Sequence, residues 1–213
     1  MGKKAIVLLS GGLHSTTALA VAKSRDCDIY AITFDYGQKS KSKLEAARKM
    51  AAFYSVKEHK TVSFDLSALL PENHPGVTEG NPVLPSRNNI YLAFALSYAE
   101  MVQADNIFIG INSIDYGDRP DCRSAFIHEW EKMANAAMQK RGIRKLDIWS
   151  PLMNTATPDI IKKGMELGVP YGDTISCLHP DDFGAACGEC LSCEYRRAGF
   201  AEAGVPDPTR YRL

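Results

Sequence analysis

The sequence predicts an α/β protein with a doubly wound, mainly parallel sheet and a small cysteine-rich segment at its C-terminal end. Three observations predict this fold class. Short, continuously apolar runs alternate along the chain with segments of helical periodicity, which is typical of a parallel sheet covered on both faces. The first apolar run leads into a glycine-rich turn, and four of the six cysteines gather within residues 177–193.

Five runs are expected to form strands, because each is short, rich in branched or aromatic residues and bounded by polar or helical segments. They are residues 5–10, 28–37, 59–66, 106–113 and 146–152. Helices are expected between them, at residues 16–24, 42–55, 88–103 and 124–141. Thr157 is expected to cap a further helix, with Pro158 at its first position. Residues 67–86 contain four prolines and predict a loop over the site.

Composition narrows the class of protein. The chain has 213 residues, and its 25 basic side chains balance its 25 acidic ones. A nucleic-acid-coating protein usually shows a basic excess, so no nucleic-acid partner is expected. The first apolar run is too short for a signal peptide, and no run approaches membrane-spanning length. The sequence therefore predicts a cytoplasmic protein with no membrane partner.

The stretch LLSGGLHSTT (residues 8–17) is typical of a phosphate-binding turn. Glycines at 11 and 12 bring bare backbone N–H groups against an anion, and the following helix N-terminus adds partial positive charge. Ser10, Ser15 and Thr16 add hydroxyl donors. The pattern is neither a Walker loop nor a dinucleotide fingerprint. A plain glycine turn capped by Ser15 is the alternative interpretation.

Polar residues follow the second and third expected strands. Asp35, Tyr36 and Gln38 come after the second strand, where a ligand of a parallel sheet binds. Arg87 and Asn88 open the helix after the proline-rich loop. An arginine suits the positive end of a helix dipole poorly, and this misfit favours an anion-binding role. A simple turn and a surface arginine are the alternatives.

Cys177, Cys187, Cys190 and Cys193 have the spacing C-x9-C-x2-C-x2-C. Four thiolates can hold a zinc ion in a closed, structural site, and clustered cysteines in a cytosolic chain favour metal over disulfides. An iron–sulfur cluster also uses four thiolates and stays open as an alternative. Four free core cysteines are the remaining alternative.

These motifs together resemble one family. SGG-x-x-S, FDYGQ, PSRNN, FIGINSIDYGDRPDCR and the cysteine cluster occur in the order seen in the 7-cyano-7-deazaguanine synthases of the PP-loop superfamily. The resemblance implies an ATP-dependent carbon–nitrogen ligase of queuosine-type biosynthesis. It would convert 7-carboxy-7-deazaguanine and ammonia to 7-cyano-7-deazaguanine, with Mg²⁺, structural zinc and a homodimeric assembly. The chain is expected to divide into a nucleotide-binding domain (1–172) and a zinc-binding segment (173–213).

The resemblance also implies which residues form the site. The ATP-binding set would be Leu9, Ser10, Gly11, Gly12, Leu13, His14, Ser15, Thr16, Asp35, Tyr36 and Gln38. The set that binds the deazaguanine acid would be Arg87, Asn88, Asp115, Tyr116 and Asp121, and the catalytic set would be Ser10, Ser15 and Arg87. The acidic residues would accept hydrogen bonds from the two adjacent donors of a guanine-like edge. On charge alone, that acidic stretch could equally be a solvated loop.

Two positions depart from the resembled pattern. His14 stands where the family has an aspartate, a better ligand for Mg²⁺ than imidazole. Thr157 stands where the family has a lysine, which is suited to neutralising the charge of a phosphate group during its transfer. The departures leave two alternatives open: transfer of the activated acid to another amine, or a protein that binds nucleotide or deazaguanine without turnover.

Overall fold

The computed structural model describes residues 2–38, 40–71, 73, 86–112, 119–138 and 145–212. Within these ranges a five-stranded sheet has the order β3-β2-β1-β4-β5, and every neighbouring pair is parallel. The strands are β1 Lys4–Leu8, β2 Asp28–Asp35, β3 Glu58–Ser63, β4 Asn106–Phe108 and β5 Asp147–Trp149. The strand order reverses between β1 and β4, so a crevice for ligands is expected at their C-terminal ends.

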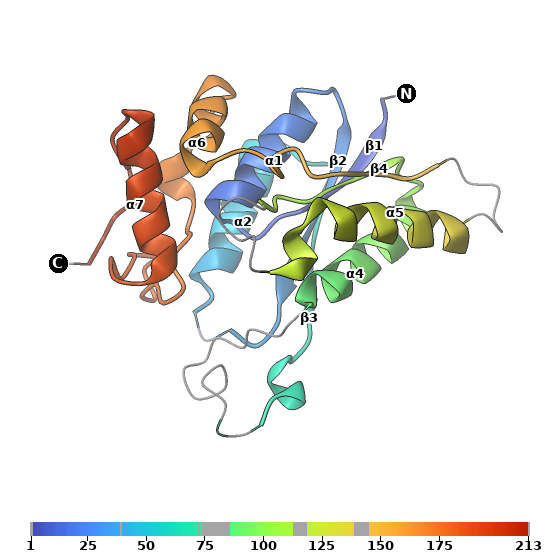
Figure 1. Cartoon of the computed structure of the whole chain (residues 1–213), viewed down its shortest axis with the longest axis horizontal. Coiled ribbons are helices and arrows are strands. Elements are labelled where there is room, and N and C mark those ends of the chain that lie inside the picture. The colour runs from blue at the N-terminus through green and yellow to red at the C-terminus, as the bar shows by residue number, and fades with distance from the viewer. Residues whose placement is uncertain are drawn as a thin grey trace.

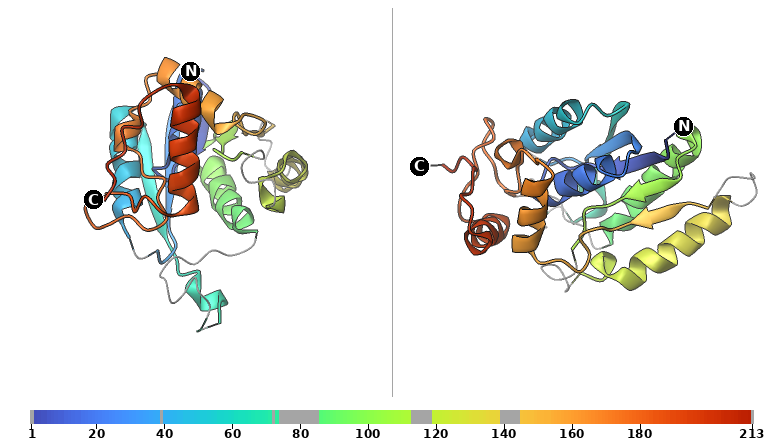
Figure 2. Two further views of the ribbon diagram at one scale, coloured as in Figure 1. Left: turned by 60° about the vertical axis from the view of Figure 1, so that its left-hand side comes forward. Right: turned by 90° about the horizontal axis from the view of Figure 1, so that it is seen from above.

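Helices cover both faces of the sheet (Figures 1 and 2). Helices α1 (Leu13–Lys23) and α2 (Ser42–Phe53) pack on one face, in a core that includes Leu19 and Met50. Helices α4 (Arg87–Val102) and α5 (Ser124–Met138) pack on the other, around Leu92 and Trp130. The central strands are buried from both sides, which explains their continuous apolar sequence. The predicted doubly wound α/β class is confirmed.

Helices α6 (Thr157–Glu166) and α7 (Leu191–Ala203) lie side by side at one end of the molecule (Figure 1). Arg196 of α7 is 3% exposed and joins the C-terminal segment to its surroundings. Its guanidinium donates to the Tyr171 carbonyl at 2.8 Å and pairs with Asp207 at 3.2 Å. We propose that the chain divides near residue 172 into a nucleotide-binding domain and a C-terminal segment. Among the described residues, no helix combines the length and apolar character needed to cross a membrane.

The remaining short elements are 3-10 turns, Ser67–Leu69, Pro120–Cys122 and Tyr171–Asp173. The expected strands at 106–113 and 146–152 extend beyond β4 and β5, which end at Phe108 and Trp149. Helix α1 begins three residues before the predicted start, and Ser15 lies inside its first turn rather than capping it. Only residues 67–71, 73 and 86 of the predicted loop lie within the described ranges.

The predicted cap at Thr157 is wrong. Ala156 is the N-cap of α6, and Thr157 is already inside the helix. The Thr157 side chain does not cap, because its hydroxyl lies 3.5 Å from His14 Nε2 and its methyl group faces Gly199 of α7. A Cβ added at Gly199 would lie 2.3 Å from that methyl carbon, so α7 approaches α6 closely here.

Candidate active site

The loop of residues 10–12 joins β1 to α1 at the reversal of strand order. Ser10 is exposed, and its hydroxyl lies 2.9 Å from the hydroxyl of Ser15. Ser15 also accepts from the Ser10 N–H at 3.1 Å and donates to the Gly12 carbonyl at 3.1 Å. These bonds hold the loop closed over the start of α1, whose first N–H groups have no partner within the helix. An arrangement of this kind can bind an anion.

Two glycines allow neighbouring backbones to meet at this loop. Gly11 has φ +76°, and a Cβ there would lie 2.4 Å from the Lys43 carbonyl oxygen of α2. A Cβ at Gly110, which follows β4, would lie 2.6 Å from the His14 carbonyl oxygen. The N–H of Ile175 donates to the Gly11 carbonyl at 2.9 Å. The loop is therefore fixed by α2, by the end of β4 and by the C-terminal segment together.

The residues predicted to bind nucleotide differ in what they offer. Leu9 and Leu13 are 1% and 2% exposed, so only their backbone groups can face a ligand. Thr16 is fully buried, and its hydroxyl has no hydrogen-bond partner within the part of the chain that the structure describes. His14 is half-buried in the first turn of α1, opposite Thr157 in the first turn of α6. The two residues that depart from the family pattern thus face each other.

The polar residues at the end of β2 and just after it differ in exposure: Gln38 is buried, whereas Asp35 and Tyr36 are half-buried. Gln38 is 7% exposed, and its side-chain oxygen accepts from the Tyr36 N–H at 2.8 Å, so it holds the turn in place. Asp35 pairs with Lys41 at 2.7 Å. Tyr36 remains half-buried, with the Arg87 guanidinium 5.8 Å from its ring centroid. Tyr36 and Arg87 thus bring the end of β2 and the start of α4 close together.

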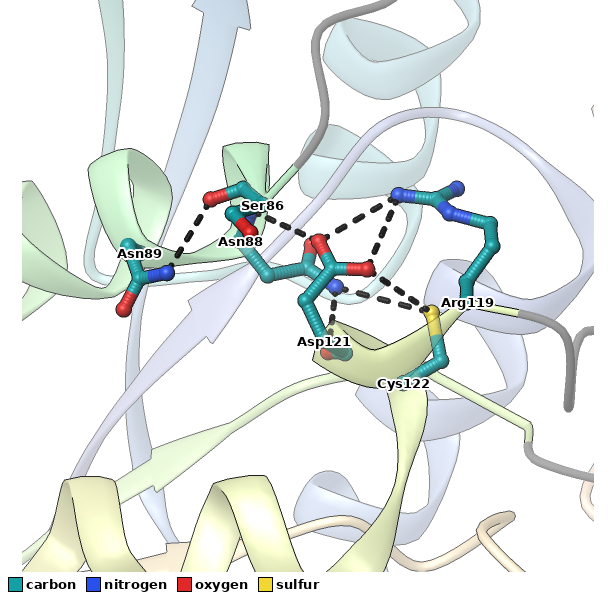
Figure 3. Close-up of polar contacts among 6 residues, drawn as sticks. All are labelled: Ser86, Asn88, Asn89, Arg119, Asp121 and Cys122. Atoms are coloured by element: carbon teal, nitrogen blue, oxygen red, sulfur yellow. Dashed lines mark hydrogen bonds and ion pairs between the residues drawn. The ribbon is translucent and has the colours of Figure 1, made fainter.

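The start of α4 is held by the segment after β4 (Figure 3). Asp121 is 3% exposed; its carboxylate accepts from the Asn88 N–H at 3.2 Å and pairs with Arg119 at 3.3 Å. The Asn88 side chain donates to the Asp121 carbonyl at 2.8 Å. A carboxylate at a helix N-terminus is stabilising. Asp121 and Asn88 therefore position Arg87, the first residue of the helix.

Replacing Asp121 with asparagine is expected to lower the free energy of unfolding by about 1–3 kcal/mol, because Arg119 loses its counter-charge and the helix end loses a carboxylate. A urea titration followed by circular dichroism measures the change. Asp159→Asn is the control, since Asp159 is exposed and pairs with Lys162 at 3.6 Å. That variant should remain within about 0.5 kcal/mol of the parent. Equal losses in both variants would contradict the role given to Asp121.

Asp115 and Tyr116, predicted to bind the base, and Asp118 beside them lie outside the described residues. Cys122 is buried, as expected of a structural cysteine, and burial raises the pKa of its thiol. Its environment therefore does not favour a nucleophilic thiolate at neutral pH.

Sequence reasoning missed Lys43. This residue lies in the first turn of α2, with its backbone against Gly11 of the loop and its side chain half-buried. Burial, and next the charge of Arg87, lower the pKa of Lys43 to about 8. The signal that could have found it is the one applied to Arg87, a cation at the positive end of a helix dipole.

Cys177, Cys187, Cys190 and Cys193 lie together, with their sulfur atoms all within 4.8 Å of one another. Backbone N–H groups surround them: those of Cys187 and His179 donate to Cys177 Sγ at 3.2 and 3.3 Å. Although burial opposes it, donation from the N–H groups of Glu189 and Cys190 lowers the pKa of Cys187 to about 7. The cluster could hold a metal ion, and His179 approaches it only through its backbone.

The parallel sheet, the glycine loop at its strand reversal and the flanking helices define a doubly wound α/β protein. The solved structure of NMN synthetase from Francisella tularensis has this fold, with a TM-score of 0.54 and 13% identity over 96% of this chain and 79% of that one. A 4-thiouridine synthetase in an RNA complex with bound ATP gives a TM-score of 0.55 and 18% identity, over 98% of this chain and 47% of that one.

The sequence comparisons define the family. The family model "Queuosine biosynthesis protein QueC" matches residues 4–204, and the chain belongs to this family. A 7-cyano-7-deazaguanine synthase from Vesicomyosocius okutanii is 45% identical over 98% of this chain and 96% of its own length. The enzyme of that name from Cellvibrio japonicus is 46% identical over 98% of each chain. One from Syntrophus aciditrophicus is 47% identical over 97% of this chain and 96% of its own.

Proposed function

We propose that this protein is a 7-cyano-7-deazaguanine synthase, an enzyme that uses ATP to convert 7-carboxy-7-deazaguanine and ammonia to the nitrile. The observation that carries the proposal is identity of 45–47% to synthases of that name over nearly the whole chain. The preformed anion cradle at residues 10–12 supports it, because such a cradle suits the phosphates of ATP. The half-buried Arg87 at the same sheet edge supports it as well.

Different residues would bind the phosphates, balance the charge of the reacting groups and bind the base. The loop N–H groups and the Ser10 hydroxyl hold the phosphates, while Ser15 holds Ser10 in place. The carboxylate of the deazaguanine acid would attack a phosphorus atom of ATP, a new P–O bond would form as the P–O bond to the departing part of ATP breaks, and Arg87 would balance the charge of the reacting groups. Ammonia would then attack the carbonyl carbon, and the phosphorylated oxygen and one proton would leave to give an amide. A second ATP would activate the amide oxygen, which would depart with its phosphate group as the nitrogen loses its protons to give the nitrile. Asp115 and Tyr116 would bind the base, as the family resemblance implies.

The cysteine cluster is proposed to hold structural zinc. Tetrahedral zinc with Zn–S bonds of about 2.3 Å requires neighbouring sulfurs about 3.8 Å apart. The pairs Cys177–Cys187 and Cys190–Cys193 are each at 3.5 Å, Cys177–Cys190 is at 3.9 Å and Cys187–Cys193 is at 4.0 Å. A cluster with several irons would hold its thiolates farther apart, so this spacing favours one ion. We propose that Mg²⁺ is carried by the ATP phosphates and water, because imidazole at His14 is a poor ligand for it.

The proposed reaction is tested by mass spectrometry of products from purified, zinc-loaded protein with 7-carboxy-7-deazaguanine, ATP and an ammonium salt. The nitrile is expected only when all three are present, and ATP consumption should depend on both other substrates. Omission of ammonium is the internal control. Absence of nitrile from the complete mixture would refute the proposal. The homodimer implied by the resemblance is a separate proposal, measured by light scattering of the same sample.

The contact between His14 and Thr157 predicts coupled effects on catalysis. Thr157 is 5% exposed, so Thr157→Lys alone buries an ammonium group beside His14 and should lower kcat/KM. Adding His14→Asp supplies a carboxylate, because the two side chains meet at 3.5 Å. A double-mutant cycle should give a favourable coupling of about 1 kcal/mol or more.

The matched cycle pairs His14→Asp with Lys162→Gln, an exposed change one turn farther along α6. It should be additive within about 0.5 kcal/mol. Additivity in the Thr157 cycle as well would contradict the coupling.

A further inference from the structure

The peptide group between Leu9 and Ser10, where β1 leads into the phosphate loop of residues 10–12, is held on both sides. Its carbonyl oxygen, on Leu9, accepts from the Thr33 hydroxyl at 2.5 Å. Its N–H, on Ser10, donates to the Ser15 hydroxyl oxygen at 3.1 Å. Because a peptide group is planar, these two bonds together fix its rotation. Side chains from β2 and α1 therefore set the direction in which the chain enters the loop.

Thr33 is itself bound by a histidine from the edge strand. Thr33 is 1% exposed, and its hydroxyl oxygen lies 2.7 Å from His59 Nε2 of β3. The Leu9 carbonyl can only accept, so the Thr33 hydroxyl proton is directed to Leu9 and His59 must donate to Thr33. His59 thus carries a proton on Nε2. Burial, and next the charge of Arg48, lower the pKa of His59, which favours the neutral ring.

The bonds on the two sides of the peptide group run in one direction. The imidazole of His59 donates to the Thr33 hydroxyl, which donates to the peptide carbonyl. The peptide N–H donates to the Ser15 hydroxyl, which donates to the Gly12 carbonyl at 3.1 Å. Hydrogen bonds in such a chain polarise and strengthen one another. One continuous path therefore connects the edge strand, through β2, with the phosphate loop.

We propose that Thr33 and His59 are positioning residues for phosphate binding. They orient the peptide group at the entry to the phosphate loop, so that the loop N–H groups and the Ser10 hydroxyl are already aligned when an anion arrives. Alignment matters because a hydrogen bond weakens steeply as its angle departs from linear. Both side chains act through the loop and do not touch the ligand. The inference rests on the proposed function for that ligand, the phosphates of ATP.

A competing role for the same bonds is to anchor the edge strand. β3 lies at the end of the sheet and pairs with β2, so the bond between His59 and Thr33 also joins these two strands. Tyr98 of α4 offers a matched comparison. It is 5% exposed, and its hydroxyl donates to Glu58, the first residue of β3, at 2.8 Å. If anchoring is the whole role, loss of either hydroxyl should lower stability alike and leave phosphate binding unchanged.

Isothermal titration of the zinc-loaded protein with Mg²⁺-pyrophosphate tests the proposal. Thr33→Val removes the hydroxyl, keeps the shape of the side chain and should raise the Kd about tenfold, the effect of losing one buried hydrogen bond. Thr33→Ser keeps the hydroxyl and should restore most of the affinity. His59→Leu should raise the Kd about threefold, whereas His59→Gln keeps an N–H donor and should stay close to the parent. Tyr98→Phe is the control and should leave the Kd unchanged.

Urea unfolding of the same variants separates positioning from stability. An unchanged Kd in both Thr33→Val and His59→Leu would overturn the proposal, and so would an equal rise in Tyr98→Phe or a parent protein that does not bind pyrophosphate. Should Thr33→Val fold poorly, the two His59 variants decide the question. If the complete reaction mixture yields no nitrile but Thr33→Val still weakens pyrophosphate binding, the proposed function fails and the positioning role stands.

Discussion

Replacing Cys193 with alanine is expected to release the metal ion proposed for the cysteine cluster and to unfold the cysteine-bearing loop that precedes α7. Cys193 is 1% exposed, and the local core contains only Cys177, Ala186 and Cys193 as buried members. So little apolar surface cannot stabilise a fold, and a structural metal normally supplies the missing free energy. Metal content measured by plasma mass spectrometry should fall from about one ion per chain to near zero. Proteolysis should then begin within residues 173–213.

Cys27→Ala provides the matched control. Cys27 is also buried, at 8% exposed, but it lies away from the cluster, beside the start of β2. Its loss removes one buried sulfur, so the metal content should be unchanged and the stability should fall by only about 1 kcal/mol. Full metal content in Cys193→Ala would show that the cysteines do not act as one site.

Loss of the metal should also weaken nucleotide binding, although no cysteine belongs to the phosphate loop. The connection runs through backbone and hydroxyl groups. Ile175, two residues before Cys177, donates its N–H to the Gly11 carbonyl at 2.9 Å. Ser42 donates to the Asp181 carbonyl at 2.7 Å. Because residues 175 and 181, on either side of Cys177, bond to the loop and to the start of α2, the proposed metal site would hold both of them in place.

The sequence was sufficient to predict what depends on local pattern. Apolar runs predicted β1, β2, β4 and β5, since a strand buried on both faces needs no polar residues, and alternation predicted β3 at the edge of the sheet. The spacing of Cys177, Cys187, Cys190 and Cys193 predicted a cluster that the structure brings together. The glycine loop also depends on local pattern, because glycine readily adopts the positive φ that Gly11 has in this turn.

What the sequence could not predict depends on partners distant along the chain. Thr157 is a residue type that favours the N-cap position, yet its side chain contacts His14 and lies against Gly199, which are on other helices. Asp121 stays a predicted substrate-binding residue, and the bond that its carboxylate accepts from the Asn88 N–H at the start of α4 is a contact that the sequence could not show. Such tertiary contacts override local propensity. Lys43 was missed because Gly11, against which its carbonyl lies, meets it only in the fold.

Gly11→Ala is expected to disrupt the phosphate cradle, both by backbone strain at a positive φ and by steric overlap with α2. Gly168→Ala separates these two causes, because it introduces the strain alone. Both glycines have similar left-handed backbones, with φ +76° and +70°. A Cβ at Gly168 meets nothing within 4 Å, whereas one at Gly11 lies 2.4 Å from the Lys43 oxygen and 2.6 Å from the Ala47 nitrogen. Both of those atoms are helix backbone, so α2 itself must move. Gly168→Ala therefore measures the cost of the positive φ alone, about 1–2 kcal/mol.

Gly11→Ala adds overpacking to that cost and should lose about 3–5 kcal/mol in total, a large share of the stability of an ordinary domain. Where the protein survives, displacement of α2 moves Lys43 and opens the loop, so the Kd for Mg²⁺-ATP should rise at least about tenfold. Urea unfolding and isothermal titration measure the two effects, and Gly168→Ala should leave the Kd unchanged. Equal destabilisation by the two substitutions would mean that α2 yields to the added methyl group, and the close approach at Gly11 would then have no part in holding the cradle.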